Sequence, residues 1–230
     1  MKILAVDTSS FPASAAVYED GVVLGEYVIR NKRKHSQNLM PMIERLFEDI
    51  DMDVSDIDVF AVTVGPGSFT GLRIGISTVR AFAEALDKPV VGVNTLEALA
   101  YNLACADAVV VPMLDARKDE VFCAAYSFSG TMPEELIAPC VMTVEEITSR
   151  FSDRKVIYTG DGMLMHKDEI TRPGAVLAPA NLSEVRAGSA AALAALKAAD
   201  GGAGDCESIK PLYLRKSQAE RLYKPKEERK

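Results

Sequence analysis

The fold is decided by the run from Val59 to Gly75, VFAVTVGPGSFTGLRIG. Its first six residues are apolar and β-prone, which predicts a buried strand. A turn with three glycines and two hydroxyl residues follows, and a helical pattern continues from Thr70 without a break. Glycines at such a junction let backbone approach backbone or a ligand closely, and the free N–H groups of the helix start favour an anion. The run therefore predicts a strand–turn–helix unit with a polar turn.

The spacing of this turn excludes two familiar chemistries. A Walker-type phosphate loop needs Gly, four residues and then Gly-Lys-Ser/Thr, but Thr70 stands five residues after Gly65 and the turn holds no lysine. A nucleophile elbow needs glycines two residues on either side of a serine, whereas Ser68 has Pro66 and Thr70 there. A ligand-binding turn and a plain strand–helix connection both remain open.

Length and composition favour a globular protein. The chain has 230 residues, 48% of them hydrophobic, which suffices for one large or two small domains with an ample core. No apolar run reaches membrane-spanning length, and the start is charged within seven residues, so we expect neither a signal peptide nor a membrane anchor. The four cysteines, at 105, 123, 140 and 206, form no close pair or metal-spaced set. We therefore expect reduced thiols and a cytoplasmic protein.

Charge is distributed unevenly along the chain. The net charge is −7, which argues against an autonomous nucleic-acid binder. From Lys210 to Lys230, however, eight basic residues stand against three acidic ones, which leaves 18 basic and 30 acidic residues in the remainder. Such a tail is either a solvated end or a contact for RNA or an acidic partner.

The order of predicted elements indicates a mixed α/β layer fold with a boundary near residue 105. The first unit reads as strands at 3–6, 13–19 and 22–30, a helix capped by Ser36 and ending near 49, a strand at 59–64, a helix at 70–86, a strand at 90–93 and a helix at 95–104. The second reads as strands at 109–114 and 121–128, a helix at 143–151, a strand at 156–159 and a helix at 187–199. The charged segment at 115–120 is expected to be an exposed hairpin.

Two features of the first unit are candidates for binding. Asp7, Thr8 and Ser9 follow the first strand, and a carboxylate beside hydroxyls suits either Mg²⁺ with a nucleotide or a hairpin entry with local side-chain caps. In the helix after the turn, Gly71 and Gly75 stand four residues apart. We interpret them as a flat groove that either packs within the molecule or forms a subunit interface with the apolar helix at 37–50.

Histidine chemistry is excluded by number and spacing. His35 and His166 are the only histidines, and no His-x-x-x-His pair occurs. A histidine-built metal site is therefore not expected, and no Ser-His-Asp arrangement can be defended.

Four segments together resemble the bacterial TsaB (YeaZ) family over essentially the full length of the chain. They are 7–9 (DTS), 65–75 (GPGSFTGLRIG), 115–122 (DARKDEVF) and 211–215 (PLYLR). The resemblance implies an actin/Hsp70/sugar-kinase (ASKHA, RNase H-like) fold of two related lobes with a truncated second lobe. The lobes would span 1–105 and 106–215, followed by a basic tail at 216–230. It also implies a role in forming N6-threonylcarbamoyladenosine in tRNA, beside the anticodon.

The resemblance further implies partners. The chain would be a non-catalytic platform for the paralogue TsaD, joined by the ATPase TsaE, and would form a homodimer through the same face when TsaD is absent. tRNA would be reached through the complex, and the chain would have no cofactor of its own, with ATP or ADP entering at the level of the complex. The expected interface residues are Leu39, Met40, Met42, Ile43, Leu46, Gly71, Ile74, Gly75 and Thr78.

The same resemblance implies a degenerate active site. TsaD carries a His-x-x-x-His metal pair on the helix where this chain has Thr95 and Leu99, neither of which replaces imidazole. Residual nucleotide-binding positions would be Asp7, Thr8, Ser9, Gly65, Gly67 and Ser68. Two alternatives stay open: an ATP-binding ASKHA phosphotransferase that uses Asp7 and the turn from Gly65 to Gly71, and a peptidase.

Overall fold

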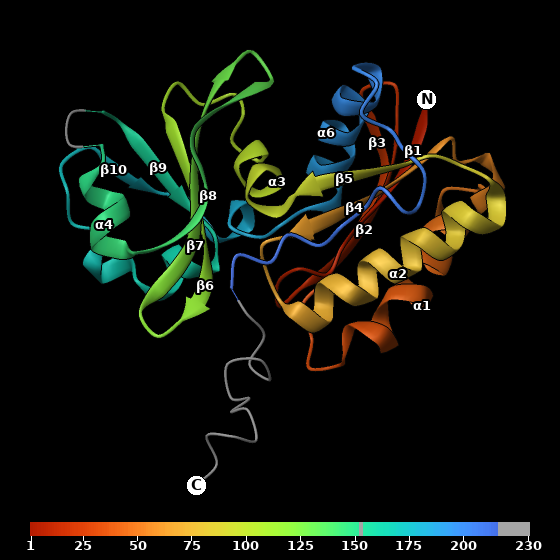
Figure 1. Cartoon of the computed structure of the whole chain (residues 1–230), viewed down its shortest axis with the longest axis horizontal. Helices are drawn as coiled ribbons and strands as arrows, with labels where there is room; N and C mark the ends of the chain where they lie inside the picture. Colours follow the sequence, from red (N-terminus) through yellow and green to blue (C-terminus); the bar gives the residue numbers. More distant parts are fainter. Residues whose placement is uncertain (152–153, 216–230) are drawn as a thin grey trace, which may run out of the picture.

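Two five-stranded mixed sheets, one in each lobe, stand side by side (Figure 1). The computed structural model describes residues 1–151 and 154–215. In the first lobe the strand order is β3-β2-β1-β4-β5, with β1, β2 and β3 antiparallel and β4 and β5 parallel to β1. These strands are β1 (Lys2–Asp7), β2 (Ala13–Glu19), β3 (Val22–Ile29), β4 (Val59–Gly65) and β5 (Val90–Asn94).

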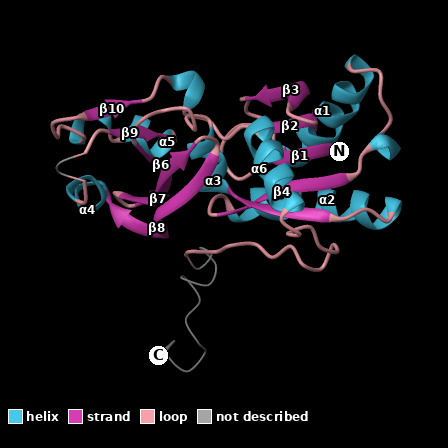
Figure 2. Ribbon diagram, turned by 90° about the horizontal axis from the view of Figure 1, so that it is seen from above, coloured by secondary structure: helices cyan, strands magenta, loops and turns pink. Residues whose placement is uncertain are grey.

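Helices cover both faces of the first sheet. One face is covered by α1 (His35–Asp49) and α2 (Phe69–Leu86), whose apolar stripes pack on the sheet in one core. The opposite face carries α3 (Thr95–Tyr101) and α6 (Ala187–Ala199), and a second core runs from this face into the other lobe. Figure 2 shows α3 between the two sheets. The lobes therefore share a continuous apolar core.

The second sheet has the order β10-β9-β6-β7-β8, in which β6, β7 and β8 are antiparallel and β9 is parallel to β6. Its strands are β6 (Val109–Arg117), β7 (Glu120–Ser129), β8 (Met132–Thr143), β9 (Val156–Thr159) and β10 (Ala175–Leu177). The short helices are α4 (Val144–Ser149), α5 (Asp161–Met165) and the 3₁₀ turns η1 (Val54–Asp56), η2 (Lys167–Glu169) and η3 (Ala180–Leu182). Thr143 and Glu146 form a capping box that starts α4.

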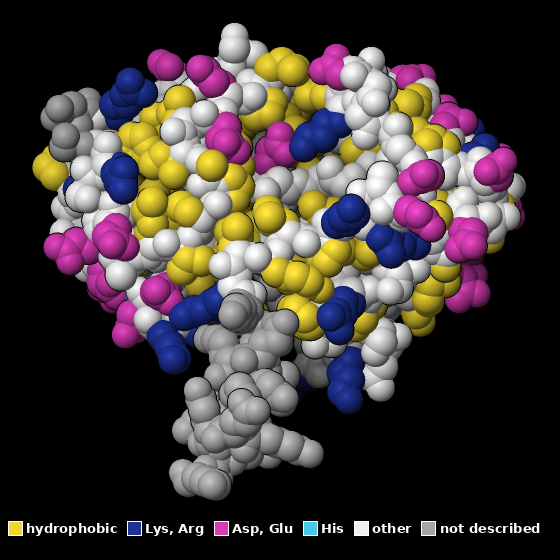
Figure 3. Space-filling view, viewed as in Figure 1, with side chains coloured by type: hydrophobic (Ala, Val, Ile, Leu, Met, Phe, Trp, Pro, Cys, Tyr) yellow, Lys and Arg dark blue, Asp and Glu magenta, His cyan; other side chains and the backbone are white. Residues whose placement is uncertain are grey.

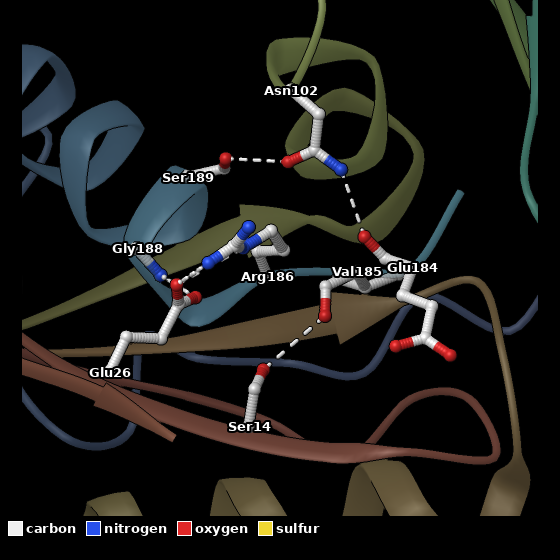
Figure 4. A network of polar contacts seen from close by, with 8 residues as sticks. All are labelled: Ser14, Glu26, Asn102, Glu184, Val185, Arg186, Gly188 and Ser189. Carbon is white, nitrogen blue, oxygen red and sulfur yellow. Dashed lines mark hydrogen bonds and ion pairs between the residues drawn. The ribbon is translucent and has the colours of Figure 1, made fainter. Parts of the chain in front are cut away.

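The chain returns to the first lobe after building the second. Glu26 on β3 is largely buried and accepts hydrogen bonds from the Arg186 guanidinium and, at 3.0 Å, from the backbone N–H of Gly188 (Figure 4). A carboxylate at this position also complements the positive end of α6. Further along, Gly204 pairs with Val90 on β5. The predicted second lobe of 106–215 is therefore wrong near its end, because α6 and Gly204 pack on the first sheet before the chain reaches the second lobe again at Arg215.

A second group of polar contacts lies where the chain passes between the lobes (Figure 4). Asn102 accepts a 2.7 Å hydrogen bond from the Ser189 hydroxyl and donates to the carbonyl of Glu184 at 2.9 Å. Ser14 donates to the carbonyl of Val185. The bonds of Asn102 join the end of α3 to the start of α6, and the bond of Ser14 ties β2 to the segment that leads into α6.

The predicted elements of the first hundred residues are confirmed with small shifts in their ends. The first helix begins at His35, one residue before the predicted cap Ser36, and α3 ends at Tyr101 rather than 104. In the second lobe, β8, α5 and β10 were not predicted. Since β8 pairs with β7, Cys123 and Cys140 face each other with their sulfurs 3.9 Å apart, a pair that sequence spacing does not reveal. Both remain free thiols.

Candidate functional site

The glycine-rich turn packs directly against another backbone segment of the same chain. It lies beside the Asp7–Ser10 turn, where β1 and β4 end, and the N–H of Ser68 donates a 2.6 Å hydrogen bond to the carbonyl of Ser9. A β-carbon on Gly67 would stand 2.3 Å from that same carbonyl oxygen. The close approach that glycine permits here is therefore used between two backbone segments.

The two glycines of α2 also face inward. A β-carbon on Gly71 would stand 1.9 Å from the carbonyl oxygen of Thr8, and one on Gly75 would stand 2.5 Å from the Thr8 hydroxyl. The Thr8 hydroxyl donates a 2.8 Å hydrogen bond to the Gly71 carbonyl. The prediction that Gly71 and Gly75 form a groove for another subunit is wrong, because the end of β1 fills it.

Most of the residues predicted to form a partner surface on α1 are buried in the core, and only one of them is exposed. Leu39, Met42, Ile43 and Leu46 form part of the core under the helix and are at most 3% exposed. Their apolar character is explained by packing on the sheet, which corrects their assignment to a free surface.

Met40, in contrast, is 49% exposed and lies on the rim of a groove between α1 and α2. This groove has a volume of about 490 Å³. It is lined by Ser36, Leu39, Met40, Phe69, Thr70, Arg73, Ile74, Ser77 and Thr78. Of the predicted interface residues, Met40, Ile74 and Thr78 therefore have surface available to a partner. We call this surface the α1–α2 face.

Asp7 is fully buried beneath the two turns. Its Oδ1 accepts hydrogen bonds from the N–H and hydroxyl of Ser9 and from the hydroxyl of Thr63, while Oδ2 has no partner among the described residues. Burial raises the pKa of this carboxyl above its usual range, and the three hydrogen bonds offset only part of that effect.

The polar groups of these turns bond largely within the protein. The hydroxyls of Thr8 and Ser9 donate hydrogen bonds within the protein, and the Ser9 carbonyl lies where a β-carbon on Gly67 would stand. On α3, Thr95 and Leu99 are both fully buried. The described residues contain no group of three or more His, Cys, Asp or Glu side chains that could hold a metal ion.

A cavity of about 810 Å³ opens between the lobes, beyond these turns. Its walls come from Ser9, Ser10, Phe11, residues 31–35, residues 66–70, residues 114–117, Phe122, Asp161 and residues 212–215. Two carboxylates lie in it: Asp161 accepts from the N–H of Asp115 at 3.1 Å, and Asp115 accepts from the N–H of Arg117. Burial raises the pKa of Asp161. We call this cavity the interlobe cleft.

Neither histidine is placed to activate a nucleophile. His35 Nε2 lies 3.0 Å from the backbone carbonyl of Ser10, and His166 Nδ1 lies 2.7 Å from the carboxylate of Glu169. Within the described ranges no Ser, Thr or Cys side chain is hydrogen-bonded to either ring. The geometry therefore lends no support to the peptidase alternative.

The segment from Pro211 to Arg215 crosses the cleft from one lobe to the other, seen in blue in Figure 1. The N–H of Leu212 donates a 2.7 Å bond to the carbonyl of Val64, and Tyr213 stacks on Phe69 with ring centroids 4.4 Å apart. Arg215 then bonds the carbonyl of Ala116 and the carboxylate of Glu120 in the other lobe. In the sequence these residues stand out only by their resemblance to a known family, and their lack of regular periodicity gives no sign of this bridging.

The predicted basic tail, 216–230, lies outside the described residues. None of the helices that the structure describes is long and apolar enough to cross a membrane.

Two α/β lobes with these sheet orders have the fold of the actin/hexokinase (ASKHA) class, as predicted. A ROK hexokinase from Thermus thermophilus shares the fold at TM-score 0.51 and 13% identity, over 87% of this chain and all of that one. The structure of YeaZ from Pseudomonas aeruginosa is far more similar, with TM-score 0.82 and 30% identity over 93% of this chain and 99% of that one.

Sequence comparison identifies the family. The model of the TsaD family, tRNA N6-adenosine threonylcarbamoyltransferase, matches residues 22–223. The tRNA threonylcarbamoyladenosine biosynthesis protein TsaB of Bacillus subtilis is 31% identical over 96% of both chains, and that of Escherichia coli is 30% identical over 95% of this chain and 96% of the relative. The chain belongs to the TsaB (YeaZ) family, within the wider group that the TsaD model describes.

Proposed function

We propose that this chain acts in the formation of N6-threonylcarbamoyladenosine in tRNA, as a non-catalytic partner of a TsaD-type transferase. The names of its full-length relatives and the match to the TsaD model support the pathway. The protein works in the cytoplasm, where tRNA is modified, and reaches tRNA as part of the complex.

The absence of an activity of its own is supported by the turns at the end of β1 and β4. Thr8 and Ser9 are engaged within the protein, and Gly67 is packed against the backbone of Ser9. A phosphate-binding turn instead presents free N–H groups to the phosphate, whereas here the N–H of Ser68 bonds the Ser9 carbonyl. The chain therefore carries no nucleotide of its own, and ATP or ADP enters with TsaE at the level of the complex.

The partner role rests on one observation, the α1–α2 face. The exposed thioether of Met40 beside a groove of about 490 Å³ presents adaptable apolar surface flanked by polar side chains such as Ser77. TsaD binds this face, and a second copy of the chain occupies it when TsaD is absent. The heterodimer and the homodimer therefore exclude each other.

Calorimetric titration of purified TsaD with the full chain tests this assignment. Met40→Asp places a charge on the α1–α2 face and should weaken binding by about tenfold or more, since an unpaired charge is desolvated at the contact. Met165→Asp, at a residue 65% exposed in the other lobe, is the matched control and should bind as the native chain does. Native affinity of Met40→Asp for TsaD would exclude this face as the interface.

Titration of the isolated chain with Mg-ATP tests the absence of catalysis. Micromolar binding accompanied by turnover would favour the phosphotransferase alternative. Assembly with TsaD that depends on nucleotide, without binding to the isolated chain, is the expected result.

A further inference from the structure

Four cationic side chains surround the mouth of the interlobe cleft. Lys32, Arg33 and Lys34 come from the loop between β3 and α1, and Arg117 comes from the β6–β7 hairpin in the other lobe. All four are exposed, and none forms an ion pair with another residue in the described part of the chain. Figure 3 shows Lys and Arg side chains in dark blue along the lower edge of both lobes.

Exposed aromatic rings line the same mouth. Phe11 is 55% exposed, and the guanidinium of Arg30 lies over its ring at 5.1 Å from the centroid. Tyr213 is 37% exposed. An exposed aromatic ring beside a guanidinium is a surface on which a nucleic-acid base stacks.

The surrounding charge makes this cationic cluster distinct. Outside residues 210–230 the chain has 18 basic and 30 acidic residues, so four unpaired cations at one cavity stand against an acidic body. The two carboxylates of the cleft, Asp115 and Asp161, each accept a hydrogen bond from a backbone N–H, and the four cations outnumber them at this cavity. The residues after Arg215 have six basic and three acidic side chains, so their charge does not complement the cluster.

We propose that the mouth of the interlobe cleft binds single-stranded RNA, with Lys32, Arg33 and Arg117 on the phosphates and Phe11 against a base. Such sites have two components: cations that contact the phosphates of the nucleic-acid backbone, and exposed aromatic rings on which bases stack. This inference rests on the proposed function, in which the RNA is the unpaired loop region of a tRNA. It gives the chain a direct share in holding the substrate.

Fluorescence anisotropy with a labelled tRNA anticodon stem–loop, measured on the complex of the full chain with TsaD, tests the site. Loss of three phosphate contacts in Lys32→Ala/Arg33→Ala/Arg117→Ala should reduce the slope of log affinity against log salt by about 2. Phe11→Leu should weaken binding by about fivefold or more while leaving the salt slope unchanged.

The control is Lys88→Ala/Lys155→Ala, because these residues lie before the amino ends of β5 and β9, away from the cleft. An unchanged salt slope in the triple variant, or an equal affinity loss in the control, would overturn the proposal. Competition by ATP as strong as that by unlabelled RNA would assign the cleft to a nucleotide instead. Co-purification of each variant with TsaD separates these outcomes from failure of the proposed function, which would abolish the complex itself.

Discussion

The hydroxyl of Thr8 donates a 2.8 Å hydrogen bond to the carbonyl of Gly71, and the carbonyl of Thr8 lies 1.9 Å from where a β-carbon on Gly71 would stand. The first turn of α2 is thus seated on the end of β1 with no space between them. This contact holds the glycine-rich turn against Ser9 and, through it, shapes one wall of the interlobe cleft.

Gly71→Ala should lower the free energy of unfolding by about 3 kcal/mol or more, because the new methyl group overlaps the Thr8 carbonyl and neither backbone can move without disturbing the other. Urea denaturation of the native and variant chains measures this. Ser77→Ala, at an exposed position of the same helix, should change stability by less than about 0.5 kcal/mol. A denaturation midpoint of Gly71→Ala equal to that of the native chain would contradict the contact.

Asp7→Asn should remove a pH dependence of stability. Burial raises the pKa of Asp7 in the native state, so between the unfolded pKa, about 3.9, and that raised value the native state binds more protons than the unfolded state. The free energy of unfolding of the native chain therefore falls as pH rises through this window, by at most about 1.4 kcal/mol per pH unit.

Urea denaturation at several pH values from about 4 to about 8 makes the comparison. The difference in stability between Asp7→Asn and the native chain should shift in favour of the variant as pH rises. Asp107→Asn, at an exposed carboxylate, serves as the control. A difference that stays constant over the whole range would show that Asp7 does not titrate with a raised pKa.

Glu26→Ala should loosen α6 from the first sheet. The substitution leaves the Arg186 guanidinium and the N–H of Gly188 without their acceptor, and we expect a loss of about 2 kcal/mol. Arg186 is 42% exposed, so water compensates part of its charge. Thermal unfolding measures the loss, and Glu44→Ala, an exposed glutamate on α1, should be nearly neutral. Equal melting temperatures for the two variants would argue against this anchor.

Tyr213→Ala should free the segment that crosses the cleft. The stack of Tyr213 on Phe69 contributes about 1 kcal/mol beyond simple burial. Its loss should increase hydrogen exchange at the N–H of Leu212, which donates to Val64. Tyr213→Phe keeps the ring and should retain most of the protection. If exchange at Leu212 is the same in both variants, the ring does not hold the segment.

The strand–turn–helix unit at 59–86 was predictable because its signals are local: a β-prone run, three glycines and a helical apolar period. The direction in which Gly71 faces could not be predicted, because a small residue packs equally well against a neighbouring strand or against another subunit. Only the position of Thr8, 63 residues earlier, decides between them.

The residues of the candidate interface could also not be identified from the sequence alone. Periodicity marks the apolar stripe of α1, but a core stripe and a docking surface share one composition, so Leu39 and Leu46 could not be separated from Met40. The cations of the cleft, such as Arg33 and Arg117, come from separate segments that only the arrangement of the lobes brings to one cavity.

The chain crosses between the lobes at two places, near Asn102 at the end of α3 and near Ser189 in the first turn of α6. These two residues are hydrogen-bonded to each other. The second lobe is therefore topologically an insertion whose two ends meet. Both ends of this insertion lie at the side of the first sheet that carries α3 and α6. The groove between α1 and α2 lies on the other side of that sheet, so the chain leaves and re-enters the first lobe away from it.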